Sequence, residues 1–403
     1  MTTVSSSAIQ LSIASRMDGL RGEGAFEVLA SARALERKGR QIFHLEIGEP
    51  DFPTAPHIVE AGVRALQNGE TKYGPAGGLL ELRVAIANHL TTHGINAAPD
   101  DVVVAPGSKP ILLYSALALL ESGDEALIPD PAYPIYDSVV RFAGAHPVTY
   151  RLDSSNNFVP DVEAIAASIT SRTRILVLNT PQNPTGGVID AGRLAALAQL
   201  AEANDLIVIV DEIYRPFNYG APPVPSILTI PGMRERTILV DGFSKAYAMT
   251  GWRLGYGLVP TPLAARFALL ALNDHACVPA FVQRAGIAAL TGTQEPLHSM
   301  INEFAVRRQL ISERLSAIPG VRITAPAGAF YAFPDVSAAT EAAGINVAQL
   351  ASKLLNDYGV ALLPGTAFGA GGEGHLRLSF ATARSDIDRA LTLVRECFTS
   401  LTS

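Results

Sequence analysis

Short apolar runs alternate with helical patterns between residues 125 and 259. The clearest runs cover residues 174–179, 206–211 and 237–241, and each ends in polar or small residues. This alternation predicts the strands of a mostly parallel sheet flanked by helices. Ligands of such sheets bind outside the carboxyl ends of the strands, so we expect the candidate chemistry there.

The pattern changes after residue 285. Long amphipathic helices are expected at 297–318 and 385–399, with short strands between them, which predicts a second domain of the α+β class. A helical stretch at 27–38 has no strand partner nearby, and we expect it to pack with that second domain.

The length of the chain supports two domains, because 403 residues exceed the size at which a single hydrophobic core stops growing. We therefore expect an α/β fold with a large domain at residues 46–285. A smaller α+β domain is expected from both ends of the chain, residues 1–45 and 286–403.

Composition and charge exclude several classes of function. The chain carries a net charge of −7 with scattered lysines and arginines, so no basic surface for nucleic acid is expected. Cys277 and Cys397 lie far apart in the chain, which predicts neither a disulfide framework nor a metal site.

Residues 1–16 lack the pattern of a signal peptide, and the longest apolar run, 111–120, is too short to span a membrane. A cytoplasmic location is expected.

A lysine follows the third of the clear strands. Ser244 and small neighbours can desolvate the amine of Lys245 and lower its pKa, as Schiff-base lysines require. Alone, such a lysine is more often a surface residue. Arg253 follows eight residues later between glycines, and a phosphate-bearing cofactor needs a bidentate cation near its anchor.

Polar residues also follow the other two clear strands. Asp211 opens the sequence Asp-Glu-Ile-Tyr, which ends at Tyr214. This acid can cap the next helix, or it can hold a pyridine nitrogen protonated and make the ring an electron sink. Asn183 lies in Asn-Pro-Thr-Gly, which is a common turn sequence, yet its side chain can hydrogen-bond a ring hydroxyl.

A candidate phosphate site precedes the helix that begins near residue 111. Gly107, Ser108 and Lys109 can present backbone N–H groups and a hydroxyl to a phosphate there. The full spacing of an ATP-binding P-loop is absent, so ATP is not implied.

A candidate carboxylate site lies near the end of the chain. The alternating strand at 375–380 places Arg377 on a face that can be solvated, or that can bind a carboxylate if it lines a pocket. The glycine pattern at 369–374 precedes this strand instead of opening a helix, so dinucleotide binding is not expected.

Taken together, these motifs resemble the class I aminotransferases of the fold-type-I pyridoxal-phosphate enzymes. The resemblance begins near Gly39 and extends to the last helix, with its motifs in the family's order and spacing at residues 45–53, 72–78, 183–186, 211–214, 244–245 and 253. It implies that the protein is a pyridoxal-phosphate-dependent aminotransferase with the family's two-domain fold. Such enzymes move an amino group between an amino acid and a 2-oxo acid by a ping-pong mechanism.

The resemblance assigns roles around the cofactor ring. Lys245 carries the cofactor as a Schiff base and moves the proton during catalysis, and Asp211 pairs with the pyridine nitrogen. Asn183 and Tyr214 hydrogen-bond the phenolic oxygen of the ring, and Tyr133 stacks on it. By the same resemblance, the catalytic residues are Lys245, Asp211 and Tyr214.

The resemblance also assigns the phosphate and the substrate. The phosphate ligands are Gly107, Ser108, Ser244 and Arg253, with Lys109 beside them and Tyr73 contributed by the neighbouring subunit of a homodimer. The α-carboxylate of the substrate is bound by Gly48, Asn183 and Arg377. In some relatives a lysine at the position of Lys109 reaches the distal carboxylate of aspartate or glutamate. Here Lys109 can do so, or can only balance the charge of the phosphate.

Two other functions fit the same motifs. Carbon–sulfur β-lyases and aminocyclopropane-carboxylate synthases share this fold and use the same lysine and aspartate. A non-catalytic effector-binding domain is the alternative from a different class, and the complete catalytic set argues against it. Phe26 can line a more apolar substrate pocket, so the amino donor and acceptor stay open.

Overall fold

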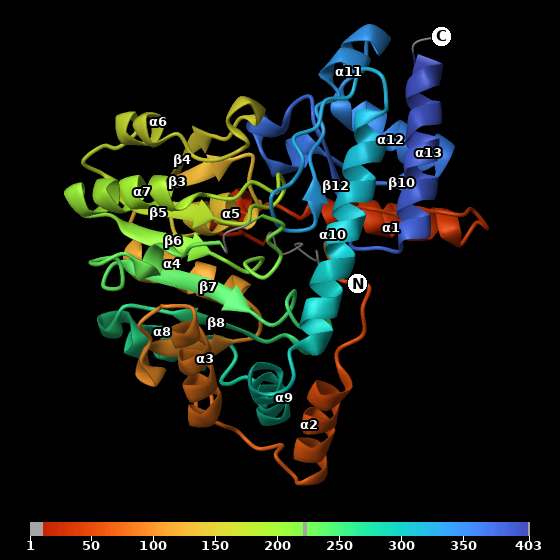
Figure 1. The fold of residues 1–403 in the computed structure, drawn as a ribbon. Helices are drawn as coiled ribbons and strands as arrows, with labels where there is room; N and C mark the ends of the chain where they lie inside the picture. Colours follow the sequence, from red (N-terminus) through yellow and green to blue (C-terminus); the bar gives the residue numbers. More distant parts are fainter. Residues whose placement is uncertain (1–10, 221–223, 402–403) are drawn as a thin grey trace, which may run out of the picture.

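A seven-stranded sheet lies at the centre of one half of the molecule (Figure 1). The computed structural model describes residues 11–220 and 224–401. In spatial order the strands are β2 (Val102–Ala105), β8 (Gly255–Leu258), β7 (Thr237–Gly242), β6 (Ile207–Asp211), β5 (Thr173–Asn179), β3 (Glu125–Asp130) and β4 (His146–Arg151). Strand β8 runs in the direction opposite to that of the other six strands. The expected α/β class with a mostly parallel sheet is confirmed.

Side chains alternate between the two faces of this sheet, as the pleat of a strand requires. In β5, Ile175 and Val177 belong to the core on one face, whereas Leu176 and Leu178 belong to the core on the other. Both faces are apolar, which explains why the strand reads as a continuous hydrophobic run in the sequence.

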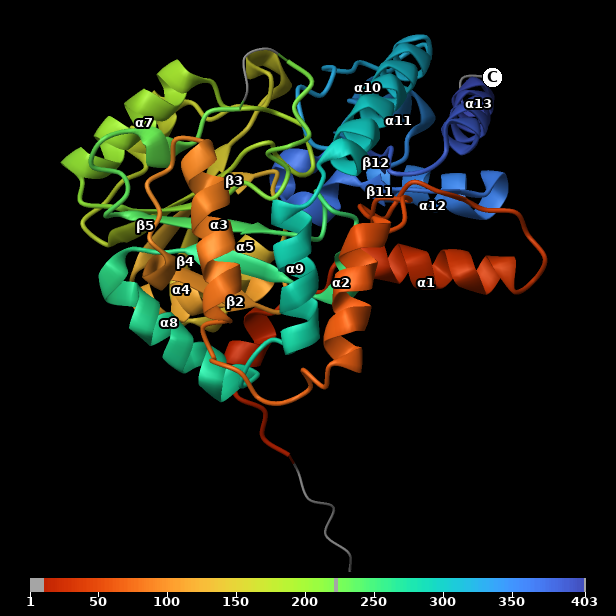
Figure 2. The same ribbon diagram turned by 60° about the horizontal axis from the view of Figure 1, so that its bottom comes forward.

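Helices cover both faces of the sheet. One face is covered by α4 (Lys109–Leu119), α5 (Ile135–Phe142) and α8 (Thr261–Asp274). The other is covered by α3 (Leu80–Thr92), α6 (Val162–Ala167), α7 (Ala191–Ala203) and α9 (Ala280–Thr291), and α2 (Pro56–Gln67) packs on α9. Figure 2 shows α3, α9 and α2 side by side. The sheet is therefore the middle of three layers.

The second half of the molecule has a core of its own. It contains α10 (Glu295–Ser316), α11 (Ser337–Ala343), α12 (Val347–Tyr358) and α13 (Arg384–Leu401), and its short strands are β1 (Phe43–His44), β9 (Tyr331–Ala332), β10 (Val360–Ala361), β11 (Leu363–Pro364) and β12 (Leu376–Ser379). Strands β11, β12 and β9 form an antiparallel sheet, and β1 pairs with β10. The helices expected at 297–318 and 385–399 are α10 and α13.

The amino-terminal helix α1 (Gly24–Glu36) packs with this second half. Its Ala32 shares a small buried cluster with Leu355 of α12 and Ala361 of β10. Helix α9 continues past residue 285, and α10 begins at Glu295. The boundaries that we expected at residues 46 and 285 stay a prediction, and residues 1–10 of the expected small domain lie outside the described part.

None of the helices in the described ranges is both long and apolar enough to cross a membrane.

Candidate active site

A cavity of about 540 Å³ opens where the carboxyl ends of β5, β6 and β7 face the second half of the molecule. Twelve of the residues that the sequence singled out line it, namely Phe26, Gly48, Ser108, Lys109, Tyr133, Asn183, Asp211, Tyr214, Ser244, Lys245, Arg253 and Arg377. The motifs that are far apart in the sequence therefore meet in one place.

Lys245 is partly buried in the segment that follows β7. Its Nζ donates a hydrogen bond to the carbonyl oxygen of Gly48 and lies 6.0 Å from the centre of the Phe330 ring. Burial lowers the pKa of Lys245 to about 8, because the charged ammonium is poorly solvated there. A substantial fraction of this amine is neutral near physiological pH and can act as a nucleophile.

Asp211 ends β6 with only 4% of its surface exposed. Its carboxylate accepts hydrogen bonds from the Tyr136 hydroxyl at 2.8 Å and from the Ile213 backbone N–H at 3.2 Å. Burial raises the pKa of Asp211 to about 6, although these two hydrogen bonds oppose the rise. A cation beside this carboxylate would reverse the shift, since it favours the charged form.

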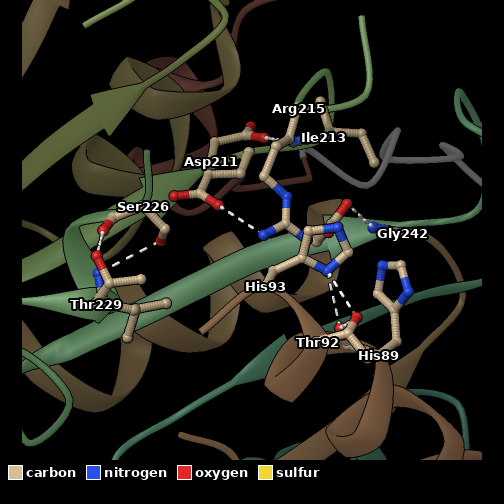
Figure 3. Close-up of polar contacts among 12 residues, drawn as sticks. His89, Thr92, His93, Asp211, Ile213, Arg215, Ser226, Thr229 and Gly242 are labelled. Atoms are coloured by element: carbon tan, nitrogen blue, oxygen red, sulfur yellow. Dashed lines mark hydrogen bonds and ion pairs between the residues drawn. The ribbon is translucent and has the colours of Figure 1, made fainter. Parts of the chain in front are cut away.

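A second group of buried charges lies behind Asp211. Arg215 extends from the segment after β6 towards His93 and His89 at the end of α3 (Figure 3). Its Nη1 lies 3.8 Å from Glu212, and burial raises the pKa of Glu212 to about 7 while the charge of Arg215 opposes that rise. The positive charge of Arg215 thus partly compensates the buried carboxylate of Glu212 beneath the cavity.

Three further polar side chains line the cavity: Asn183, Tyr214 and Tyr331. The Oδ1 of Asn183 is buried and has no hydrogen-bond partner. The hydroxyls of Tyr214 and Tyr331 lie 2.7 Å apart, and burial raises the pKa of both phenols above the usual value for tyrosine. An unsatisfied buried acceptor is costly, so Asn183 Oδ1 fits a site whose donor comes from a bound molecule.

A tight turn faces the start of α4. Gly107 has a φ of +94°, and a Cβ atom there would lie 2.3 Å from a nitrogen of Arg253. A Cβ at Gly255 would lie 2.4 Å from the carbonyl carbon of Gly107. Glycine at both positions lets the guanidinium approach the backbone next to Ser108, where an anion can also meet the helix amino terminus.

Arg377 lies in β12 with 3% of its surface exposed. It donates a hydrogen bond to the carbonyl oxygen of Glu46, and its guanidinium lies 4.7 Å from the centre of the Tyr331 ring and 5.1 Å from that of Phe368. Its Nε is buried without a partner, and burial lowers the pKa of Arg377. A buried guanidinium with a free donor is suited to a carboxylate ligand.

The amino-terminal segment closes one side of the cavity. Glu23, which directly precedes α1, forms an ion pair with Lys109 and accepts a hydrogen bond from the Tyr133 hydroxyl at 2.9 Å. The ammonium of Lys109 lies 5.7 Å from the centre of the Tyr133 ring. No local pattern in the sequence singles out Glu23.

Two of the expected residues do not line the cavity. Gly107 lies directly behind it, against Arg253. Tyr73 is 92% exposed and lies on the surface of the chain. Its proposed role in a neighbouring subunit stays a prediction.

The lining residues that the sequence reasoning missed include three with polar contacts in the cavity: Glu23, Tyr136 and Tyr331. Tyr136 is nearly fully buried in α5, and Tyr331 is nearly fully buried among phenylalanines. A tyrosine inside an apolar stretch needs a partner for its hydroxyl, and this was the available signal for both. No comparable signal marked Glu23.

Known proteins resemble this chain over nearly its whole length. Residues 40–394 match the sequence family described as aminotransferase class I and II. An aspartate aminotransferase of Musicola paradisiaca (strain Ech703) is 37% identical over 96% of this chain and 97% of its own length.

Solved structures share the fold as well. The aspartate aminotransferase from Thermus thermophilus with maleate has a TM-score of 0.90 at 35% identity, covering 96% of this chain and all of that one (100%). The aromatic aminotransferase from Pyrococcus horikoshii OT3 has a TM-score of 0.86 at 37% identity, covering 92% and 99%.

Proposed function

The chain belongs to the class I and II aminotransferases, and on that premise we propose that the cavity around Lys245 is its active site. Enzymes of this type use pyridoxal phosphate to move an amino group between an amino acid and a 2-oxo acid. The observation that carries the assignment is the meeting of the Lys245 amine, the Asp211 carboxylate and the Arg377 guanidinium in one cavity. The alternative of a carbon–sulfur β-lyase is not favoured, because the full-length relatives are aminotransferases.

The residues present fit pyridoxal phosphate. Asp211 is a buried carboxylate that a protonated pyridine nitrogen would satisfy, and Asn183 has a buried side-chain amide whose oxygen has no protein partner. We propose that the amide N–H of Asn183 and the hydroxyl of Tyr214 would donate to the phenolic oxygen of the ring, with Tyr133 beside its plane. Ser108, Ser244 and Arg253, with the backbone at Gly107, would hold the phosphate.

Lys245 is the proposed base. When bound, pyridoxal phosphate supplies an electron sink that stabilises negative charge at the substrate Cα. The Nζ of Lys245, with its pKa lowered to about 8 by burial, can take the proton from Cα of the amino acid in one half-reaction and deliver a proton to the carbon derived from the 2-oxo acid in the other. The carboxylate of Asp211 would stabilise a protonated ring nitrogen, because it is buried with little other positive charge beside it.

Arg377 is the proposed ligand of the substrate α-carboxylate. Its hydrogen bond to the carbonyl oxygen of Glu46 and its cation–π contact with Tyr331 hold the guanidinium at the cavity wall, while its Nε is left without a protein partner. A Cβ at Gly48 would lie 1.9 Å from the Tyr331 hydroxyl, so only glycine leaves room for the tyrosine there. A fixed fork at this position orients the substrate Cα relative to Lys245.

We propose a dicarboxylic amino acid, aspartate or glutamate, as one of the two substrates. Arg377 accounts for one carboxylate, and Lys109 is a second cation that lines the cavity. The relatives named aspartate aminotransferase, one of them solved with the dicarboxylate maleate, support this choice. A homodimer with shared sites and a cytoplasmic location belong to the same proposal.

The substrate proposal is tested by Lys109→Ala with aspartate, glutamate, alanine and phenylalanine. The substitution is expected to lower kcat/KM for the two dicarboxylates by the factor that corresponds to a loss of about 2–5 kcal/mol of transition-state stabilisation. The value of kcat/KM for alanine is expected to stay the same. A uniform loss across the four substrates would leave Lys109 as a residue that only balances the phosphate.

A further inference from the structure

The carboxylate of Glu23 occupies the end of the cavity at which the proposed substrate carboxylate would bind. Its Oε1 pairs with Lys109 and accepts the hydroxyl proton of Tyr133 at 2.9 Å. The side chain of Glu23 is 24% exposed, and that of Lys109 is 43% exposed. The carboxylate of Glu23 is thus largely sheltered and held by two donors, whereas the ammonium of Lys109 remains partly open to the cavity and to solvent.

Helix capping does not explain the position of the Glu23 carboxylate. Glu23 is the N-cap residue of α1, yet its side chain makes no capping hydrogen bond to the helix. The usual side-chain caps are Ser, Thr, Asp and Asn. The carboxylate instead turns into the cavity.

The charge of Glu23 reaches the residues that are proposed to bind and convert the substrate. Burial lowers the pKa of Lys245 and of Arg377, and the negative charge of Glu23 opposes that lowering at both groups. A carboxylate that acts on Lys245 and Arg377 is close enough to act on a bound amino acid.

We propose that Glu23 is a specificity-determining residue that competes with the side-chain carboxylate of the substrate for Lys109, and so favours amino acids with uncharged side chains. The inference rests on the proposed function, in which Lys109 binds the distal carboxylate. A dicarboxylate has to displace Glu23 from Lys109 or lie beside a like charge, and both are unfavourable.

The ion pair between Glu23 and Lys109 suits a ping-pong enzyme, because both substrates of such an enzyme bind in turn to the same subsite. An uncharged side chain placed against Lys109 alone would desolvate an unpaired ammonium, which is costly. With Glu23 in place, that side chain meets a compensated ion pair. The pocket can then accept an uncharged partner, and its affinity for dicarboxylates is lower than Lys109 alone would give.

The test compares Glu23→Gln with Glu27→Gln. Glu27 lies in the first turn of the same helix, is exposed, and does not line the cavity, so its substitution removes the same charge without touching the pair. Two quantities are measured on the holoenzyme: kcat/KM for aspartate, glutamate, alanine and phenylalanine, and the dissociation constant of the unreactive dicarboxylate succinate by calorimetry.

Glu23→Gln is expected to raise kcat/KM for aspartate and glutamate and to tighten succinate binding about tenfold or more, while kcat/KM for alanine and phenylalanine stays the same or falls. Glu27→Gln is expected to behave like the wild type. If Glu23→Gln leaves the ratio between dicarboxylic and uncharged substrates unchanged, or lowers it, the inference is wrong.

Lys109→Ala separates this inference from the proposed function. If Lys109→Ala weakens succinate binding while Glu23→Gln has no effect, the inference about Glu23 fails and the role of Lys109 stands. If Lys109→Ala leaves succinate binding and dicarboxylate turnover unchanged, the proposed substrate site fails and the competition fails with it.

Discussion

Asp211 shows how a single buried side chain can oppose folding and support function. Its carboxylate lies at the end of an apolar strand, where its two hydrogen bonds replace only part of the lost hydration. The folded protein therefore binds the proton of Asp211 more tightly than the unfolded chain does. A cationic ligand would convert this unfavourable burial into binding affinity.

We predict that Asp211→Asn stabilises the cofactor-free protein in a pH-dependent way. The pKa rises from 3.8 in the unfolded chain to about 6 in the fold, so Asp211 costs nothing below about pH 4 and up to about 3 kcal/mol above pH 6. In urea unfolding at fixed protein concentration, the free energy of unfolding of the variant is expected to increase relative to that of the wild type as pH rises through this window. A difference that does not depend on pH would contradict the assigned shift.

The residues that could be predicted from sequence are those that stand at fixed spacings after strands. Lys245, Asp211 and Asn183 each follow an apolar run, and the topology of a parallel sheet brings such positions to one edge. The burial of Tyr136 had a signal in its apolar surroundings, but its partner was not predictable, because Asp211 lies 75 residues away and the pairing depends on how α5 packs. The contact of Glu23 with Lys109 spans 86 residues and has no local signature.

At the level of elements, the reversal of β8 shapes the proposed phosphate site. This strand runs antiparallel between β2 and β7, and its first residue, Gly255, meets the turn at Gly107. The parallel strands could be read from their apolar runs. The insertion of β8 between two distant strands could not, since the order of strands depends on long-range pairing.

Gly255→Ala is expected to weaken cofactor binding. The new Cβ would lie 2.4 Å from the carbonyl carbon of Gly107 and 2.6 Å from the backbone nitrogen of Ser108, so the turn must shift. Overpacking of this size costs about 1–3 kcal/mol, which corresponds to a rise of about 5- to 150-fold in the dissociation constant of pyridoxal phosphate.

Gly77→Ala is the matched control, because a Cβ at Gly77 makes only an ordinary contact of 3.7 Å with Ala268 and Gly77 does not line the cavity. Both variants are titrated with pyridoxal phosphate and the change in absorbance is followed. Equal affinities in the two variants would show that the turn at Gly107 does not hold the phosphate.

On the scale of the whole molecule, the cavity joins the two halves of the chain. Lys245 and Asp211 come from the central sheet, whereas Arg377 comes from the small sheet of the second half. Tyr73 is 92% exposed and does not line the cavity of its own chain, so its proposed role predicts that it reaches the cavity of a second copy.

Mixed dimers of Tyr73→Phe and Lys245→Ala subunits test this assembly. If Tyr73 acts on the neighbouring site, the mixed dimer contains one site that is free of both substitutions, and about half of the wild-type activity is expected at low cofactor concentration. Activity no higher than that of the Tyr73→Phe homodimer would show that the sites are not shared.

The most direct measurement of the central claim is the position of the cofactor on the chain. The holoenzyme is reduced with borohydride, digested and mapped by mass spectrometry, with Lys245→Ala as the control. We predict a pyridoxyl group on Lys245 alone in the wild type and none in the variant, because the amine of Lys245 has its pKa lowered to about 8 by burial in the cavity. A pyridoxyl group on a different lysine, or its absence from the wild-type protein, would contradict the account.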